Sequence, residues 1–437
     1  MIPNTYHIET YGCQMNFSDS EIVASVLNKA NYVQVSKPEE ASLIFLNTCS
    51  IREHAEQRVL NRLKHLKSLK NKNNRLIIGI LGCMAERIQD KLFEEGADLI
   101  AGPDTYRELP QMIQEVINHS KAVNTLLSES ETYEDINPLR IGNNEVSAFI
   151  SIMRGCQNFC SYCVVPYTRG SERSRSPESI LVEAKELFEN GYREVILLGQ
   201  NVNSYRSGVY GFPKLISKVA EINPLLRIRF ATSHPKDLSN DLIEVIAEYP
   251  NICKSIHLPL QSGSNRILQL MNRKYTSEFY LDRINAIYKA IPECSISSDI
   301  IAGFCSETEE DHQQTIAVMK QAAFDYAFMF KYSERSGTTA SEKMNDDVPE
   351  KTKLRRLNEI INLQNQLSLH SNKKDIGKIS EVLVEGTSKR SSKQLSGRTS
   401  QNKVVVFTDD KHKAGDYVNV RITQCSSATL QGDVAPY

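Results

Sequence analysis

Short apolar segments alternate with helical patterns along most of this 437-residue chain. In the N-terminal third, the strand-like runs Tyr6–Tyr11, Leu43–Asn47 and Leu76–Leu81 are each followed by a helical stretch. Such alternation favours βαβ units and a parallel sheet. Because parallel strands end at one edge of a sheet, we expect the residues that follow these three runs to meet there.

A second series of strand-like segments begins after the polar stretch Ser128–Val146, which we interpret as a linker. Six repeats are too few for a closed eight-stranded barrel. The segments are Ala148–Met153, Glu194–Leu198, Arg227–Thr232, Lys254–Leu258, Ser295–Ile301 and Tyr326–Phe330. A helical pattern follows over Pro349–Asn372, and from Ile376 the pattern predicts short strands of a small β-barrel (Glu381–Glu385, Val404–Phe407, Tyr417–Ile422 and one near Leu430).

Cys156, Cys160 and Cys163 follow the first strand of the second series with the spacing Cys-x3-Cys-x2-Cys. A 4Fe–4S cluster is held by cysteine thiolates, normally four, so three would leave one iron open to a further ligand. Structural zinc would need a fourth ligand, and the nearest histidines, His119 and His234, are distant in sequence. Disulfides would need an oxidising compartment. We therefore favour an open iron–sulfur cluster at this motif.

A second set of three cysteines follows the three N-terminal strands. Cys13, Cys49 and Cys83 stand at equivalent positions after their strands, so their thiols are predicted to converge at the carboxyl edge of the sheet. This set again lacks a fourth thiolate. We interpret it as a second three-thiolate site. The remaining cysteines have no ligand-like spacing and are assigned to packing or surface: Cys253, Cys294, Cys305 and Cys425.

The motif around Cys156, with Tyr162 before the last cysteine, resembles the signature of radical S-adenosylmethionine (SAM) enzymes. With Val164–Gly170 and the N-terminal cysteine motifs, it resembles the methylthiotransferase family. The resemblance implies an α/β fold with a parallel-sheet N-terminal domain, a (β/α)6 partial TIM barrel and a small C-terminal β-barrel, the TRAM module. The domains implied are 1–125 with an auxiliary cluster, 142–372 as the radical SAM core, and 373–437 as TRAM.

The same resemblance implies two 4Fe–4S clusters and SAM as cofactors, with no catalytic side chain of the protein's own. The SAM-contacting candidates lie in loops after the barrel strands. They are Tyr162, Gln200, Asn201, Asp299 and Gly303. After Phe304 the chain departs from the family pattern, with Cys305 where proline is common. We expect His234 and His257 to be structural residues.

The net charge of −1 leaves any nucleic-acid surface to local basic patches. Lys and Arg outnumber Asp and Glu in residues 372–437, so tRNA is the predicted partner of that module. The helix after Cys49 is also rich in Lys and Arg, and a solvated face or a phosphate-contacting face would explain it equally well. The RNA-binding candidates are Arg52, Lys389, Arg390 and Arg398.

The substrate implied is N6-dimethylallyladenosine beside the tRNA anticodon, methylthiolated at carbon 2 through a deoxyadenosyl radical and two SAM. The alternatives are threonylcarbamoyl-adenosine in tRNA, a ribosomal-protein aspartate, or a non-enzymatic iron–sulfur protein that binds RNA. We expect a cytoplasmic monomer served by an electron donor such as flavodoxin or ferredoxin. Ten cysteines without a signal peptide favour a reducing compartment, and no apolar run approaches the length of a membrane span.

Overall fold

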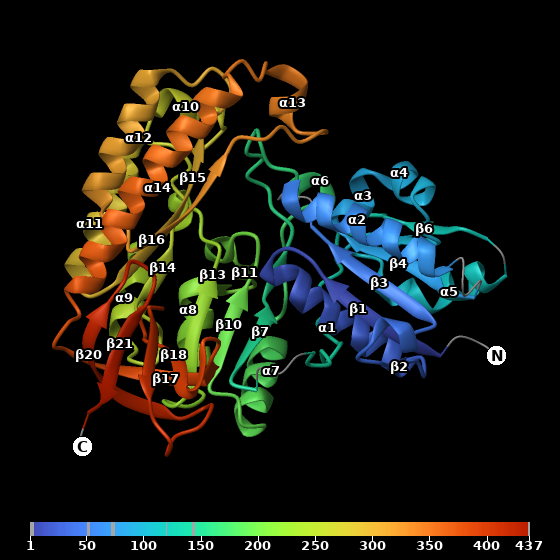
Figure 1. The fold of residues 1–437 in the computed structure, drawn as a ribbon, viewed down its shortest axis with the longest axis horizontal. Helices are drawn as coiled ribbons and strands as arrows, with labels where there is room; N and C mark the ends of the chain where they lie inside the picture. Colours follow the sequence, from blue (N-terminus) through green and yellow to red (C-terminus); the bar gives the residue numbers. More distant parts are fainter. Residues whose placement is uncertain (1–3, 50–52, 71–74, 119, 142–144, 436–437) are drawn as a thin grey trace. The chain divides into compact units, whose positions relative to one another are not determined.

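The computed structural model describes residues 4–49, 53–70, 75–118, 120–141 and 145–435. The chain divides into two compact units (Figure 1). The first comprises residues 1–142, 153–159 and 163–179, and the second comprises residues 143–152, 160–162 and 180–437. Segments on either side of Cys160 therefore pack with the N-terminal residues. Each unit is described by itself.

The first unit contains a six-stranded parallel sheet in the order β2-β1-β3-β4-β5-β6. Its strands are β1 (Thr5–Thr10), β2 (Val33–Gln34), β3 (Leu43–Thr48), β4 (Ile77–Gly82), β5 (Leu99–Ala101) and β6 (Ala122–Asn124). Its helices are α1 (Gln14–Lys29), α2 (Glu53–Lys70), α3 (Cys83–Arg87), α4 (Gln89–Glu94), α5 (Leu109–Ile117) and α6 (Val165–Arg169). A short antiparallel pair joins β8 (Met153–Arg154) to β9 (Arg173–Ser174).

Both faces of this sheet are covered, which is why every residue of β3 and β4 is buried. One core contains Phe45 with residues of α1 and α5, such as Leu27 and Met112. The other contains Ile44 with residues of α2 to α4, such as Leu63. The continuous apolar runs of the central strands thus reflect burial on two sides.

Six parallel strands of the second unit form two three-stranded sheets, β7-β10-β13 and β14-β15-β16. A bridge between Ile228 and Ile252 joins the two sheets, as expected for an open partial barrel. The strands are β7 (Ser147–Ser151), β10 (Glu194–Leu198), β13 (Arg227–Ala231), β14 (Ser255–His257), β15 (Ser295–Ala302) and β16 (Tyr326–Lys331), with a small hairpin of β11 (Arg206–Ser207) and β12 (Tyr210–Gly211).

Helices separate these strands, and α11, α12 and α14 lie along the outer side of β14 to β16 (Figure 1). The helices are α7 (Pro177–Glu189), α8 (Phe212–Ala220), α9 (Asn240–Glu248), α10 (Asn265–Leu270), α11 (Ser277–Ala290), α12 (Glu309–Ala322), α13 (Thr339–Lys343) and α14 (Glu350–Lys373). Helix α12 begins with a capping box in which Thr308 and Asp311 bond each other's backbone.

The C-terminal residues of the second unit form a closed five-stranded barrel, β17-β18-β19-β21-β20. The strands are β17 (Ile379–Ser388), β18 (Ser391–Arg398), β19 (Val404–Thr408), β20 (Tyr417–Cys425) and β21 (Leu430–Val434). This barrel packs against the segments that lead into the partial-barrel strands, since the Tyr417 hydroxyl donates to the Leu225 backbone oxygen at 3.0 Å.

The predicted fold class is confirmed, and three local expectations were wrong. Strand β18 was missed because its sequence is polar. The helical stretch expected after the third N-terminal strand is broken into α3 and α4. The stretch interpreted as a linker is partly structural, since Tyr133 and Ile136 are buried in the core of the first unit. The predicted domain boundaries remain a proposal.

Candidate metal centres

The three N-terminal cysteines stand at the ends of neighbouring strands. Cys13 follows β1 and caps α1, Cys49 follows β3, and Cys83 follows β4 as the first residue of α3. Strands β1, β3 and β4 are adjacent and parallel, so their carboxyl ends meet at one edge. The structure brings the thiols together as predicted, and a hydrogen bond joins Cys13 to Cys49.

Two glycines allow the loops that carry these cysteines to approach one another. Gly12 has a φ of +121°, and a Cβ there would lie 2.3 Å from the Cβ of Cys49. Gly82 has a φ of +87°, and a Cβ there would lie 2.6 Å from the Thr48 backbone oxygen. A side chain at either position would therefore separate the cysteine loops.

Buried asparagines fix these loops further. Asn16 accepts from the Cys13 thiol at 3.1 Å and donates to the Thr48 backbone oxygen at 2.7 Å. Asn47 donates from Nδ2 to the Asn16 backbone oxygen at 2.8 Å. Hydrogen bonds across two strand ends hold the thiols in a defined arrangement.

The thiols lie in a positive field. The hydrogen bond with Cys49 lowers the pKa of the Cys13 thiol to about 6, and Arg169 contributes to the same shift. Burial raises the pKa of Cys83, although the guanidinium of Arg169 opposes this effect. The Arg169 Nε donates to the Cys83 Sγ at 3.2 Å. Charge compensation of this kind suits thiolates that bind a metal.

The second cysteine motif lies in the loop between β8 and α6. Cys156 belongs to the first unit, where Asn158 Nδ2 lies 3.4 Å from its Sγ. Cys160 belongs to the second unit, where the buried Arg273 donates from Nη1 to its Sγ at 3.3 Å. Cys163 belongs to the first unit. Each described triplet thus has one buried arginine in contact with a thiol.

The predicted SAM-contacting residues differ in their surroundings. Tyr162 packs edge-on against Phe304. Asn201 is engaged within the protein, since it donates to Asp237 Oδ2 at 2.7 Å and accepts from the His234 backbone. Gly303 has a φ of +73°, and a Cβ there would meet Lys353 Cγ at 2.4 Å, so the close packing of α14 explains this glycine.

Gln200, after β10, has a different character. Its side-chain oxygen and nitrogen are both buried and have no hydrogen-bond partner among the described residues. The side-chain nitrogen and oxygen of Asn203 are likewise buried and have no hydrogen-bond partner among the described residues. Buried polar groups are normally paired. Orphaned amides at the carboxyl end of a barrel strand fit a site that is completed by a polar cofactor such as SAM.

Asp299 lies on β15, opposite Phe328 of β16 and beside His257 of β14. Its carboxylate is 3.4 Å from His257 Nε2, and His257 Nδ1 is 3.0 Å from the Ser297 hydroxyl. His234 is buried against the ring of Tyr275, and burial lowers its pKa to about 2. Both histidines have protein partners, in keeping with structural roles.

The RNA-binding candidates fall into three cases. Lys389 and Arg390 are exposed at the turn between β17 and β18. Arg398 donates from Nε to Glu385 at 3.0 Å, and its backbone oxygen accepts from Arg227, so it takes part in packing. Arg52 lies outside the described residues.

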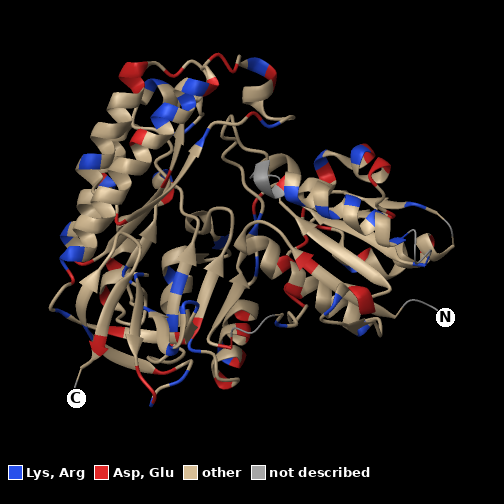
Figure 2. Cartoon of the chain, viewed as in Figure 1, with Lys and Arg blue, Asp and Glu red and all other residues tan. Residues whose placement is uncertain are grey.

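The basic residues of α2 (Figure 2) are largely paired with acidic groups of the same unit. Arg62 binds Glu9 at 2.6 Å, and Lys70 binds Asp98. These pairs favour a solvated structural face over a phosphate-contacting one.

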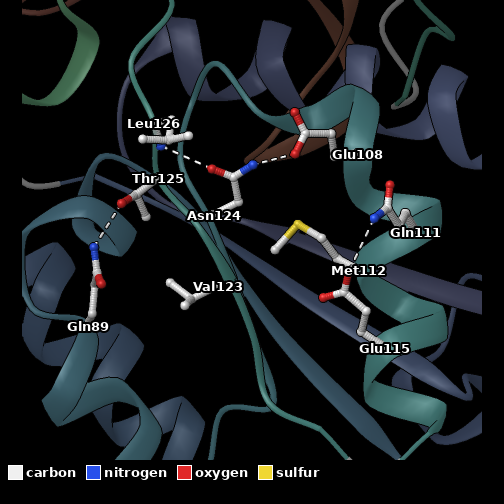
Figure 3. A pocket seen from close by; sticks show the side chains of 9 residues that line it. All are labelled: Gln89, Glu108, Gln111, Met112, Glu115, Val123, Asn124, Thr125 and Leu126. Atoms are coloured by element: carbon white, nitrogen blue, oxygen red, sulfur yellow. Dashed lines mark hydrogen bonds between the residues drawn. The ribbon is translucent and has the colours of Figure 1, made fainter.

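A separate pocket of about 460 Å³ lies beside β6 and α5 (Figure 3). Its polar side chains bond one another, as where Gln89 donates to Thr125 at 2.8 Å. No sequence-predicted site residue lines it. The lining residues are Gln89, Glu108, Gln111, Met112, Glu115, Val123, Asn124, Thr125 and Leu126.

Sequence reasoning missed Asp19, Arg154, Arg169 and Arg273 as site residues. Arg169 lies in a motif that was recognised, but nothing in its local pattern indicates a contact with Cys83. Asp19 has the pattern of an ordinary polar helix residue, yet it is fully buried. Among the described helices, none has the length and apolar character needed to cross a membrane.

Three family models match the chain: Uncharacterized protein family UPF0004 over residues 5–102, the Radical SAM superfamily over 150–319, and the TRAM domain over 373–435. The fold resembles that of the radical SAM methyltransferase TsrM from Kitasatospora setae, with a TM-score of 0.56 at 11% identity over 75% of this chain and 72% of that chain. OxsB, a cobalamin-dependent SAM radical enzyme, gives a TM-score of 0.52 at 12% identity over 83% of this chain and 56% of that chain.

Fold, cysteine motif and family models together define an enzyme of the radical SAM superfamily, whose members use SAM and a 4Fe–4S cluster. Curated proteins named tRNA-2-methylthio-N(6)-dimethylallyladenosine synthase are 58% identical in Phocaeicola vulgatus, 59% in Bacteroides thetaiotaomicron and 54% in Chloroherpeton thalassium. Each alignment covers 98% of this chain and 95% of the relative. The chain belongs to this family of radical SAM tRNA methylthiotransferases.

Proposed function

We propose that this enzyme places a methylthio group on carbon 2 of N6-dimethylallyladenosine beside the tRNA anticodon. The observation that carries the proposal is identity of 54–59% to synthases of that name over almost the whole of both chains. Both cysteine triplets and the orphaned amides fit the cofactors that such a reaction needs.

The C2–H bond of adenine is not activated, so no ordinary base in the chain could functionalise it. When bound, two 4Fe–4S clusters and two SAM molecules supply the radical that removes this hydrogen and the methylated sulfur that replaces it. The SAM-binding cluster would be held by Cys156, Cys160 and Cys163. The second cluster would be held by Cys13, Cys49 and Cys83.

The protein's own residues bind and orient. Arg273 is buried and supports the Cys160 thiolate with a permanent positive charge. Its Nη2 also donates to the Pro259 backbone oxygen at 3.0 Å, which fixes the guanidinium in place. The buried amide nitrogen and oxygen of Gln200, which have no hydrogen-bond partner among the described residues, are proposed to bond SAM. The other proposed contacts of SAM are Tyr162, Asn201, Asp299 and Gly303.

An aromatic row on β16 suits the prenyl group. Tyr326, Phe328 and Phe330 alternate along the strand and share the face that carries Asp299 of β15, because register pairs Asp299 with Phe328. All three rings are partly exposed, at 51%, 41% and 37%. An apolar branched group would gain burial there.

The C-terminal barrel is proposed to bind tRNA, with Lys389 and Arg390 at its exposed turn as phosphate contacts. A base in the anticodon loop is single-stranded, so its extrusion costs only a few kcal/mol. We further propose a cytoplasmic monomer with a flavodoxin- or ferredoxin-like donor and domains at 1–125, 142–372 and 373–437.

The decisive experiment is anaerobic reconstitution with iron and sulfide, followed by incubation with SAM, a reductant and prenylated tRNA. About eight irons per chain, deoxyadenosine release and a thiomethyl mass increase on the tRNA are the expected results. SAM left uncleaved by the reduced protein would reject the enzyme in favour of an RNA-binding iron–sulfur protein.

A further inference from the structure

Arg169 is held in the interior of the first unit between a carboxylate and a thiol. It ends α6, six residues after Cys163, and is 2% exposed. Its Nη2 donates to Asp19 Oδ2 at 2.7 Å, while its Nε donates to Cys83 Sγ at 3.2 Å. Because an arginine stays protonated in proteins, it brings a permanent positive charge to the N-terminal cysteines.

The third nitrogen of this guanidinium is unused. Arg169 Nη1 is buried and has no acceptor among the residues that the structure describes. An unpaired buried donor destabilises the folded protein, so such groups usually have a partner. An acceptor that the chain itself does not supply would explain the free nitrogen.

Charge counting leads to the same conclusion. Three buried arginines, Arg154, Arg169 and Arg173, share only two buried aspartates, Asp19 and Asp104. One positive charge is therefore in excess within this group. Buried charges are normally paired, and of the three arginines Arg169 is the one that contacts a cysteine.

We propose that Arg169 is a positioning residue of the N-terminal cysteine site, where it compensates the negative charge of the bound cluster and donates from Nη1 to it. This inference rests on the proposed second cluster. Arg169 also ties the segment that follows the SAM cysteine motif to Cys83. Loss of its charge should make the cluster harder to reduce, because reduction adds a negative charge.

The test isolates the N-terminal site in the full-length Cys156→Ala/Cys160→Ala/Cys163→Ala protein. Arg169→Gln, Arg169→Lys and Arg154→Gln are added singly, and each protein is reconstituted anaerobically. Arg154→Gln is the matched control, since Arg154 is equally buried but donates to the other oxygen of Asp19 at 2.8 Å and to the Pro103 backbone oxygen at 2.9 Å rather than to Cys83. Iron per chain, the electron paramagnetic resonance spectrum and the midpoint potential are measured.

We expect the parent to bind about four irons and Arg169→Gln to keep them with a more negative potential. At fixed potential its ratio of reduced to oxidised cluster should fall about tenfold, equivalent to about 59 mV for one electron. Arg169→Lys should show a smaller fall in this ratio and an altered spectrum. Lysine keeps the positive charge but lacks the planar guanidinium that bonds Asp19 and Cys83 at the same time. Arg154→Gln should change the ratio less than threefold.

An unchanged potential in Arg169→Gln, or an equal fall in Arg154→Gln, would overturn the proposal. Should Arg169→Gln not fold, Arg169→Lys decides alone, and an unchanged spectrum and potential would reject it. A parent that binds no iron would instead reject the second cluster on which the inference rests. The two failures are therefore distinguishable.

Discussion

Arg229 on β13 donates from Nη2 to the backbone oxygen of Thr399 in the C-terminal barrel at 2.7 Å. The same guanidinium donates from Nε to the buried Glu194 on β10 at 2.6 Å. Arg227 makes a similar bond to the residue before Thr399, with its Nη1 2.8 Å from the Arg398 backbone oxygen. The loop around Thr399 in the C-terminal barrel therefore packs against strand β13 of the partial barrel.

Removal of Arg229 should destabilise the protein strongly. Arg229→Ala leaves Glu194 buried without its partner, at a cost of about 3–5 kcal/mol in the free energy of unfolding. Urea unfolding followed by circular dichroism is suitable, since the chain has no tryptophan. The control is Lys218→Ala on α8, which removes an exposed ion pair with Glu221 and should change the free energy of unfolding far less. Similar losses in both variants would contradict the prediction.

The exposed turn of the C-terminal barrel should bind phosphates of the tRNA. Lys389→Ala/Arg390→Ala should weaken tRNA binding and reduce the slope of log affinity against log salt by about 2, because each side chain is expected to neutralise one phosphate. SAM cleavage without tRNA should stay unchanged. Binding is measured by filter retention at several salt concentrations, and Lys289→Ala on α11 is the control. An unaltered salt slope would show that RNA binds elsewhere.

His234 should make stability depend on pH. Burial lowers its pKa to about 2 in the folded state, with Arg273 and Lys236 adding repulsion, whereas an unfolded histidine has a pKa of about 6.5. Below pH 6.5 the unfolded chain binds the proton and the folded one does not, so the free energy of unfolding falls as pH falls. This group contributes about 1.4 kcal/mol per pH unit.

The measurement is urea unfolding of the apoprotein between pH 5 and pH 7.5. His234→Gln should lose stability less steeply than the parent as the pH falls. His370→Gln, at an exposed position of α14, should follow the parent curve. Equal slopes for the parent and His234→Gln would contradict a neutral, buried imidazole.

Sequence reasoning succeeded where chemistry is encoded locally. Cys13, Cys49 and Cys83 were placed together because each follows a strand of one parallel sheet, and β10 was predicted to the residue. It failed where the contact is distant in sequence. Arg169 meets Asp19 across 150 positions, and no periodicity encodes such a pair.

The sequence patterns also failed to predict a polar strand and the packing contacts of a loop. β18 has few apolar residues, because a small barrel strand needs only Leu395 to face the core. Arg398 remains a predicted RNA contact, chosen because it is basic and lies in a loop-like sequence, but its packing role was not foreseen. Its partner Glu385 is 13 residues away on the neighbouring strand, a pairing that only the register of β17 and β18 reveals.

The two cysteine triplets should be separable. Alanine at Cys156, Cys160 and Cys163 should leave about half the iron and abolish deoxyadenosine formation, since the open iron that binds SAM is removed. Alanine at the N-terminal triplet should also halve the iron, yet preserve SAM cleavage and abolish thiomethyl insertion. Iron assay and chromatography of deoxyadenosine measure both outcomes. A protein without Cys13, Cys49 and Cys83 that cannot cleave SAM under reduction would refute this division of labour.

Substrate choice follows from the aromatic row of β16. A dimethylallyl group is apolar, whereas a threonylcarbamoyl group would place a carboxylate beside Phe328 and near the carboxylate of Asp299, whose like charge makes its burial there unfavourable. Unmodified tRNA would forfeit roughly 1–3 kcal/mol of apolar burial. Prenylated tRNA should therefore win a competition among the three tRNAs, read as thiomethyl incorporation by mass. Phe328→Ala should raise the KM for prenylated tRNA about tenfold or more, and should reduce the preference of the enzyme for prenylated over unmodified tRNA. The control is Phe279→Ala on α11, a partly exposed ring outside this row, which should change neither the KM nor the preference. Preference for the threonylcarbamoyl substrate would overturn the assignment to prenylated adenosine and leave the radical chemistry intact.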